Sequence, residues 1–134
     1  MFLLTTAFLF AGAFSQVTKD CGAGKTLFTI NRIAVSPDVP IKNENFTVFL
    51  DYTVPDGTTV LSGTAKYSFT YNFIPITPTI EDICKDTTCP ITPGPKSQSS
   101  TSTFPDISGT LVTKTQWYDI NQKELLCYSL TLKV

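Results

Sequence analysis

Cysteines and carboxylates are the residues of this 134-residue sequence whose types could do chemistry. There is no histidine, which excludes serine or cysteine nucleophiles activated by an imidazole. Glu81 and Asp82 form an adjacent acidic pair in a predicted loop, but successive side chains do not converge on one substrate atom. Gly24–Thr26 lacks the upstream glycine spacing of a phosphate-binding loop. We therefore expect a protein that is not an enzyme and needs no cofactor.

The four cysteines are expected to form two disulfides. Cys84 and Cys89 are close enough in the chain to close a small loop, which leaves Cys21 to pair with Cys127. A metal site is the weaker alternative, because zinc needs two close ligand pairs or cysteines combined with histidines. The sequence therefore predicts no metal site.

Residues 1–15 have the composition of a secretory signal. They carry no charge, are rich in phenylalanine and leucine, and end in small residues. The run is shorter than the ~20 apolar residues that span a bilayer as a helix. A buried N-terminal strand is the alternative, but the polar segment Gln16–Asp20 follows at once and favours a signal. We expect residues 16–134 to form one secreted domain.

The remaining sequence is typical of strands separated by turns. Residues 45–54 alternate apolar and polar side chains, and a turn at Pro55, Asp56 and Gly57 follows. Further strands are predicted at about 26–35, 64–76, 109–119 and 125–134, with Pro75 ending the second of these. Several short strands with turn signals between them indicate an all-β sandwich.

Two segments are predicted to lie outside the strands. One helical turn is allowed near Ile80–Cys84. Residues 93–103 are rich in serine and threonine and are predicted as a polar loop, either a solvated connection or a mobile lid.

Asn45 begins an Asn-Phe-Thr glycosylation sequon on the polar face of its strand.

The charges exclude one class of partner. Ten basic and eleven acidic residues give a net charge of −1, and the basic residues are scattered along the chain. Nucleic acid is not an expected partner, because its binding needs a concentrated basic face.

Aromatic surface is what the sequence has in excess. Tyr67, Phe69, Tyr71 and Phe73 share one face of the strand predicted at 64–76. A packed core between two sheets is the plain interpretation. A cavity for an apolar ligand between slightly separated sheets is the functional interpretation. Periodicity alone does not distinguish a filled core from a hollow one.

A series of short motifs resembles the ML (lipid-recognition) domain family across nearly the whole mature chain. The motifs are Asp20–Gly22, the spaced Cys84 and Cys89–Ile91, and Leu125–Cys127 near the end. The resemblance is closest to phosphatidylglycerol/phosphatidylinositol transfer proteins, and the lysosomal cholesterol carriers of the Niemann–Pick type C pathway are also similar. Many relatives carry another cysteine pair around what is here 37–43, which this sequence lacks.

The resemblance implies an immunoglobulin-like β-sandwich of two antiparallel sheets with a lipid cavity between them, closed by the same two disulfides. It implies a monomeric carrier that moves phospholipid between membranes by transient contact with them. A sterol carrier of the endosomal or lysosomal lumen, or a secreted protein-binding sandwich without lipid, are the alternatives. The cavity mouth is expected near the loop after Cys89, with Ile91, Pro93 and Phe104. The candidate lipid contacts are Tyr67, Phe69, Tyr71, Phe73, Ile91, Phe104, Trp117 and Tyr128.

Overall fold

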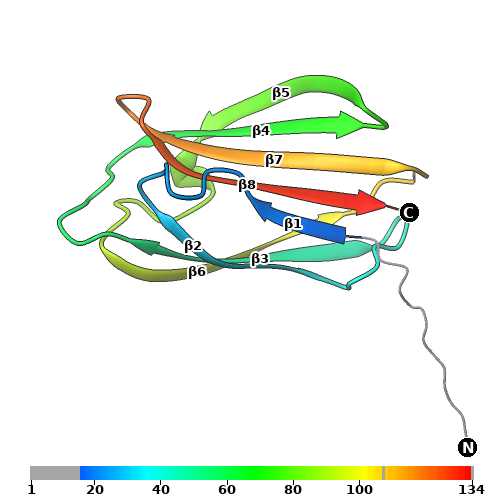
Figure 1. Cartoon of the computed structure of the whole chain (residues 1–134), viewed down its shortest axis with the longest axis horizontal. Coiled ribbons are helices and arrows are strands. Elements are labelled where there is room, and N and C mark those ends of the chain that lie inside the picture. The colour runs from blue at the N-terminus through cyan, green and yellow to red at the C-terminus, as the bar shows by residue number, and fades with distance from the viewer. Residues whose placement is uncertain (1–15, 107, 134) are drawn as a thin grey trace, which may run out of the picture.

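Two antiparallel sheets pack face to face in the computed structural model, which describes residues 16–106 and 108–133 (Figure 1). The larger sheet has the strand order β1-β8-β7-β4-β5, and the smaller has the order β2-β3-β6. The strands are β1 (Gln16–Asp20), β2 (Thr29–Ser36), β3 (Asn45–Val54), β4 (Gly63–Tyr71), β5 (Ile74–Asp82), β6 (Gly94–Thr103), β7 (Thr110–Asp119) and β8 (Glu124–Lys133). The predicted all-β sandwich is confirmed.

The N-terminal signal stays a prediction. Residues 1–15, predicted as a signal, lie outside the described residues. Gln16–Asp20, which sequence reasoning read only as a polar start, forms β1 and pairs with β8. The described domain therefore begins with an edge strand of the larger sheet.

The prediction of one strand over 64–76 is wrong, because the chain turns back within it. β4 ends at Tyr71, and β5 starts at Ile74 and pairs antiparallel with β4. Asn72 and Phe73 have φ angles of 47° and 69°, as a two-residue type I′ hairpin turn requires. The turn contains no glycine from which it could be predicted, and a bulky residue at positive φ is uncommon.

β5 is an exposed edge strand that the sequence pattern did not indicate. All its residues except Glu81 are exposed, so no alternation of buried side chains marks it. Pro75 lies inside this strand and does not end one; an edge strand tolerates proline because the missing N–H faces solvent. Glu81 and Asp82 belong to this strand and not to a loop. The 3₁₀ turn η1 follows at Ile83–Lys85, slightly later than the predicted helical turn.

The polar loop predicted over 93–103 is also wrong. Gly94–Thr103 forms β6, whose ten residues all have partners on β3. The segment has no apolar residue besides Pro95 and shows no apolar alternation, since most side chains of this edge strand are exposed. Its hydrogen bonds come from the backbone, so serine and threonine suffice to form it.

Aromatic residues join the two sheets at one end of the sandwich. Tyr52 on β3 meets Trp117 on β7 edge-on, with ring centroids 5.5 Å apart. The Phe28 ring stacks on Tyr52, with centroids 5.6 Å apart. Phe28 N–H also donates to the Leu125 carbonyl of β8 at 2.8 Å. These contacts close the sandwich along the β2 and β8 side.

Both predicted disulfides are confirmed. Cys21 and Cys127 join the end of β1 to β8 across 106 residues of sequence. Cys84 and Cys89 close a loop of five residues between η1 and β6. The two crosslinks restrict very different lengths of unfolded chain.

Removing the long-range disulfide should destabilise the domain more than removing the short one. The chain-entropy relation gives about 4.7 kcal/mol for a loop of ~100 residues and about 2 kcal/mol for one of about five. We expect C21A/C127A to lose roughly twice as much free energy of unfolding as C84A/C89A, measured by urea denaturation. Equal losses would show that local packing, and not chain entropy, sets the contribution.

Candidate functional site

A cleft of about 170 Å³ lies between the two sheets. One part of its wall is apolar, and its residues are Phe46 and Val48 of β3, Tyr67 and Phe69 of β4, and Tyr128 and Leu130 of β8. Strand alternation explains this, because Phe46 and Val48 share the inward face of β3, and Tyr67 and Phe69 share that of β4. The cleft therefore offers aromatic and aliphatic surface from both sheets.

The wall that β6 contributes is polar. Ser100 and Ser102 line the cleft and stand opposite Val48 and Phe46 in the β3–β6 register. Partners in register point to the same face of a sheet, so these serines face inward beside apolar neighbours. Thr113 and Thr115 of β7 add two hydroxyls. Small polar side chains on an edge strand leave this side of the cleft less filled than a leucine would.

Tyrosine hydroxyl and carboxyl groups lie close together at the end of the cleft nearest η1, which we call its inner end. The Tyr67 hydroxyl donates a hydrogen bond to the Asp86 carboxylate just after η1. Burial, followed by the Asp86 hydrogen bond, holds the pKa of Tyr67 well above its ordinary value. Burial also raises the pKa of Tyr128. A hydrogen bond from the protonated Glu81 carboxyl to the Asp86 carboxylate raises the pKa of Glu81. Tyr67, Tyr128 and Glu81 therefore stay protonated to higher pH than free side chains of the same kinds do.

A second, polar pocket of about 370 Å³ lies beside β6. Its base includes the buried side chains of Tyr52 and Ile91. The rest of its wall comes from the disulfide loop and the start of β6, and consists of Asp86, Thr87, Thr88, Pro90, Thr92, Lys96, Ser97 and Gln98. The Lys96 ammonium donates to the Thr92 hydroxyl at 2.9 Å. We call this space the polar pocket.

The candidate lipid contacts separate into four groups. Tyr67, Phe69 and Tyr128 line the cleft, and Ile91 lines the polar pocket. Trp117 and Phe104 are buried in the core, where Trp117 packs against Tyr52 and Phe104 meets Phe46 edge-on at 6.0 Å.

The other candidates lie at the ends of strands. Tyr71 lies at the end of β4, where its hydroxyl donates to the Ser108 carbonyl at 2.9 Å. Phe73 is 87% exposed at the hairpin tip, because the strand that should have carried it inward already ended at Tyr71. Pro93, predicted at the mouth, is exposed directly before β6.

Sequence reasoning missed several residues that line the two spaces. Phe46 and Val48 lie on the apolar face of the strand at 45–54, so that alternation was the signal that could have found them. Ser100, Ser102 and Lys96 were missed because their segment was predicted as a loop.

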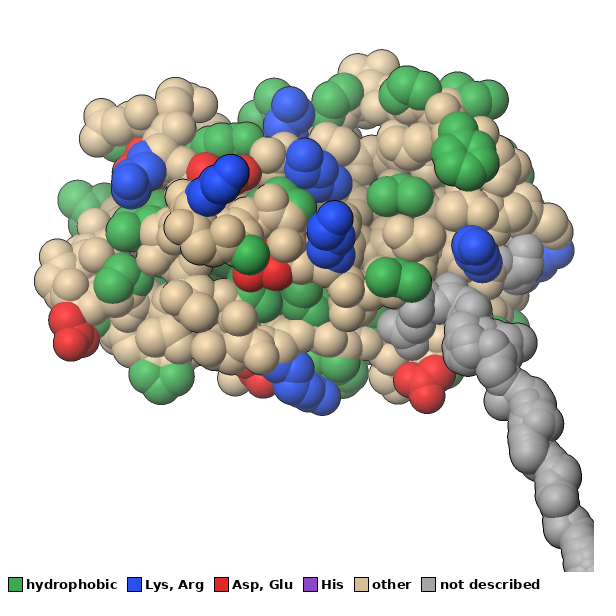
Figure 2. Space-filling model, in the orientation of Figure 1, with side chains coloured by type: hydrophobic (Ala, Val, Ile, Leu, Met, Phe, Trp, Pro, Cys, Tyr) green, Lys and Arg blue, Asp and Glu red, His purple; other side chains and the backbone are tan. Residues whose placement is uncertain are grey.

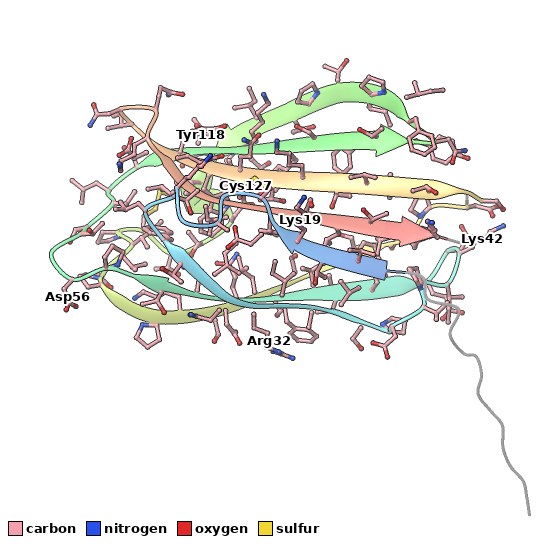
Figure 3. All side chains as sticks on the ribbon, in the orientation of Figure 1. Lys19, Arg32, Lys42, Asp56, Tyr118 and Cys127 are labelled. Carbon is pink, nitrogen blue, oxygen red and sulfur yellow. A yellow bond between two sulfur atoms is a disulfide. The ribbon has the colours of Figure 1, made fainter. Side chains whose placement is uncertain are left out.

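Charged groups are spread over the surface. Figure 2 shows some Lys and Arg side chains following one another down the middle of the visible face and others set apart from them. Arg32 pairs with Asp51 at 3.6 Å and lies on the outer face of the smaller sheet (Figure 3). Within residues 16–106 and 108–133, no group of three His, Cys, Asp or Glu side chains could hold a metal ion. No helix in this part of the chain is long and apolar enough to cross a membrane.

Three comparisons with known proteins bear on this site. Residues 15–134 match the model of the family described as ML domain. The chain is 24% identical over 131 residues to a Dictyostelium discoideum protein whose name assigns it provisionally to phosphatidylglycerol/phosphatidylinositol transfer, covering 94% of this chain and 92% of that protein.

Two solved structures share the fold. A Niemann–Pick type C2 protein of the Japanese carpenter ant superposes with a TM-score of 0.69 at 18% identity, over 87% of this chain and 98% of its own. Chicken MD-1, complexed with lipid IVa, superposes with a TM-score of 0.59 at 14% identity, over 88% of each chain.

The cleft tyrosines should ionise only at unusually high pH. Their pKa values are raised in the folded chain, so above pH ~10 the folded state binds more protons than the unfolded state, and stability falls as the pH rises. We expect an alkaline titration of tyrosinate absorbance to show a late-ionising group that Tyr67→Phe reduces. Complete ionisation of all tyrosines near pH 10 in the folded protein would contradict this.

Proposed function

The chain belongs to the ML domain family, and on that premise we propose that it is a carrier that encloses phosphatidylglycerol or phosphatidylinositol between its two sheets and moves it between membranes. ML domains have a lipid-binding fold, and the observation that carries the proposal is the cleft itself. Aromatic and aliphatic side chains from β3, β4 and β8 form its walls, and each buried methylene of a lipid tail contributes about 0.8 kcal/mol. The Dictyostelium relative, whose name refers to phosphatidylglycerol/phosphatidylinositol transfer, favours phospholipid over sterol as the ligand.

The cleft can widen to accept an acyl chain without breaking a strand ladder. β5 and β6 are edge strands of different sheets, and no ladder joins them. Separating them therefore breaks no interstrand hydrogen bonds, which are the costly contacts within a sheet. The aromatic contact of Tyr52 with Trp117 lies at the end of the sandwich away from the β4–β5 hairpin. It can keep the sheets joined while their edges separate. Entry of a lipid on the β5 and β6 side is the least costly route.

We place this activity in the secretory route, outside the cell or in an endosomal or lysosomal lumen. Two disulfides close the domain, and disulfides persist in oxidising compartments. Asn45 of the sequon is exposed at the start of β3, where its side-chain oxygen accepts a hydrogen bond from Thr103 at 3.0 Å. An exposed sequon on the outer rim can carry a glycan without blocking the cleft.

Filling the cleft should abolish lipid binding without disturbing the core. Ser100→Phe introduces a large ring at the cleft wall, while Ser99→Phe puts the same ring on the opposite face of β6. We expect native mass spectrometry of the protein, purified after incubation with mixed vesicles, to show about one phospholipid per chain for the unchanged protein and Ser99→Phe, and almost none for Ser100→Phe. Bound sterol alone would overturn the choice of phospholipid, and a lipid-free protein would favour a protein-binding sandwich.

The β4–β5 hairpin is the surface that we propose meets the membrane. Residues 67–80 contain no charged side chain, and Phe73, Ile74 and Ile76 are 87%, 65% and 50% exposed. Hydrophobic side chains line the upper edge of the molecule where β5 lies (Figure 2). Ile76 pairs with Phe69, a cleft residue, so the exposed apolar surface continues into the cleft. An uncharged apolar tip favours insertion among lipid chains over docking by charge.

Removing the apolar tip should slow lipid transfer while leaving lipid binding intact. We expect F73S/I74S to reduce the rate of phospholipid transfer between vesicles at least about tenfold, since each side chain gives up roughly 1.5 kcal/mol or more of burial. The matched control is L61S/I120S, because both residues are 73% exposed and belong to loops remote from the hairpin. Equal loss in both variants, or strong dependence on salt, would contradict hairpin insertion.

A further inference from the structure

The polar pocket and the cleft lie next to each other along the same strands. Lys96, Gln98, Ser100 and Ser102 alternate along the inward face of β6, opposite Tyr52, Leu50, Val48 and Phe46. The first two line the polar pocket and the last two line the cleft. Positions two apart on a strand are about 7 Å apart. A molecule with an apolar part and a polar part can therefore occupy both spaces at once.

Lys96 supplies a cation with spare hydrogen-bonding capacity. Its side chain is half-buried at the pocket wall, and its ammonium donates to the neutral Thr92 hydroxyl. The ion pair found in the described chain joins Arg32 to Asp51 and does not involve Lys96. An ammonium has three donors, so two remain for an anion. β6 is also an edge strand, which leaves backbone N–H groups on one side without strand partners.

The other lining residues favour a neutral, hydroxylated group. Thr87 and Thr88 offer hydroxyls that both donate and accept, and the Asp86 carboxylate accepts. Asp86 already accepts the Tyr67 hydroxyl and lies beside Glu81, which ties it to the inner end of the cleft. Tyr52 is the one aromatic residue of the described lining, so the cage of rings that holds a choline group is missing.

We propose that the polar pocket is a headgroup site for a phosphate diester that carries a polyol, with Lys96 bound to the phosphate and the hydroxylated wall bound to the polyol. This assignment rests on the proposed function, since the acyl chains attached to the phosphate occupy the cleft. The same chemistry occurs in a water-soluble, deacylated glycerophosphodiester. The occupant whose chemistry matches both spaces, once the cleft has widened, is the intact phospholipid.

The test compares Lys96→Gln with Lys114→Gln, which removes the same charge from an exposed position on β7. Each folded protein is incubated with vesicles containing equal amounts of phosphatidylinositol, phosphatidylglycerol, phosphatidylcholine and a sterol, and bound lipid is identified by native mass spectrometry. We expect Lys96→Gln to bind about tenfold less phosphatidylinositol and phosphatidylglycerol, the loss typical of one hydrogen bond to a charged group, with no fall in sterol. Lys114→Gln should match the unchanged protein.

Other outcomes separate this inference from the proposed function. Unchanged phosphatidylinositol and phosphatidylglycerol binding by Lys96→Gln, while Ser100→Phe abolishes it, would overturn the headgroup site and leave the carrier intact. Equal losses in both lysine variants would overturn it in favour of general electrostatic attraction. A protein that takes up only sterol would overturn both proposals. In the last outcome, the protein binds no phospholipid and yet shows amide chemical-shift changes on addition of glycerophosphoinositol that disappear in Lys96→Gln. That result would show that the ligand of the pocket is the water-soluble diester and would overturn the intact lipid as its occupant.

Discussion

The edge-on contact of Tyr52 with Trp117 is the interaction on which the rest of the structure depends. It joins the middle strand of the smaller sheet to the larger sheet, and Phe28 completes the stack from the closed side. Both rings are almost fully buried, and aromatic pairs of this geometry contribute about 0.5–1.5 kcal/mol beyond their area. The indole N–H of Trp117 has no hydrogen-bond partner in the described part of the chain, so packing alone holds it. Because the sheets are joined here, they need not be filled tightly elsewhere.

The cleft follows from that division of the sandwich into a closed and an open half. Beyond Tyr52 on β3 the inward residues become smaller toward Val48, and the β6 residues opposite Val48 and Phe46 are serines. Large residues on both sheets would fill this space and give an ordinary core. The polar inward face of β6 therefore has two consequences: it leaves room beside the apolar walls, and it places Lys96 and hydroxyl groups at one end of that room.

Strand alternation predicted the apolar half of this arrangement and could not predict the polar half. β3 and β8 lie where the period-two pattern put them, and Tyr67, Phe69 and Tyr128 do line the cleft. Periodicity reports the face of a side chain and not whether the facing space is filled, so Trp117 and Phe104 were grouped with them although both are buried in the core. β6 has no apolar pattern because backbone pairing with β3 forms it, and a turn of Asn72 and Phe73 carries no glycine signal.

In the proposed lipid transfer, the positions of the hairpin and the polar pocket would impose an order on the steps. β4 runs from the closed end to the hairpin, and the cleft residues Tyr67 and Phe69 lie between the two. The polar pocket lies on the far side of the cleft from the hairpin, since Lys96 and Gln98 precede Ser100 and Ser102 along β6 toward that end. With the hairpin inserted in a bilayer, the headgroup of the lipid must leave the bilayer before the tails do, because the polar pocket lies at the far side of the cleft. Its tails then follow through the cleft and pass from hydrocarbon to apolar side chains with little exposure to water, which keeps the hydrophobic cost of transfer low.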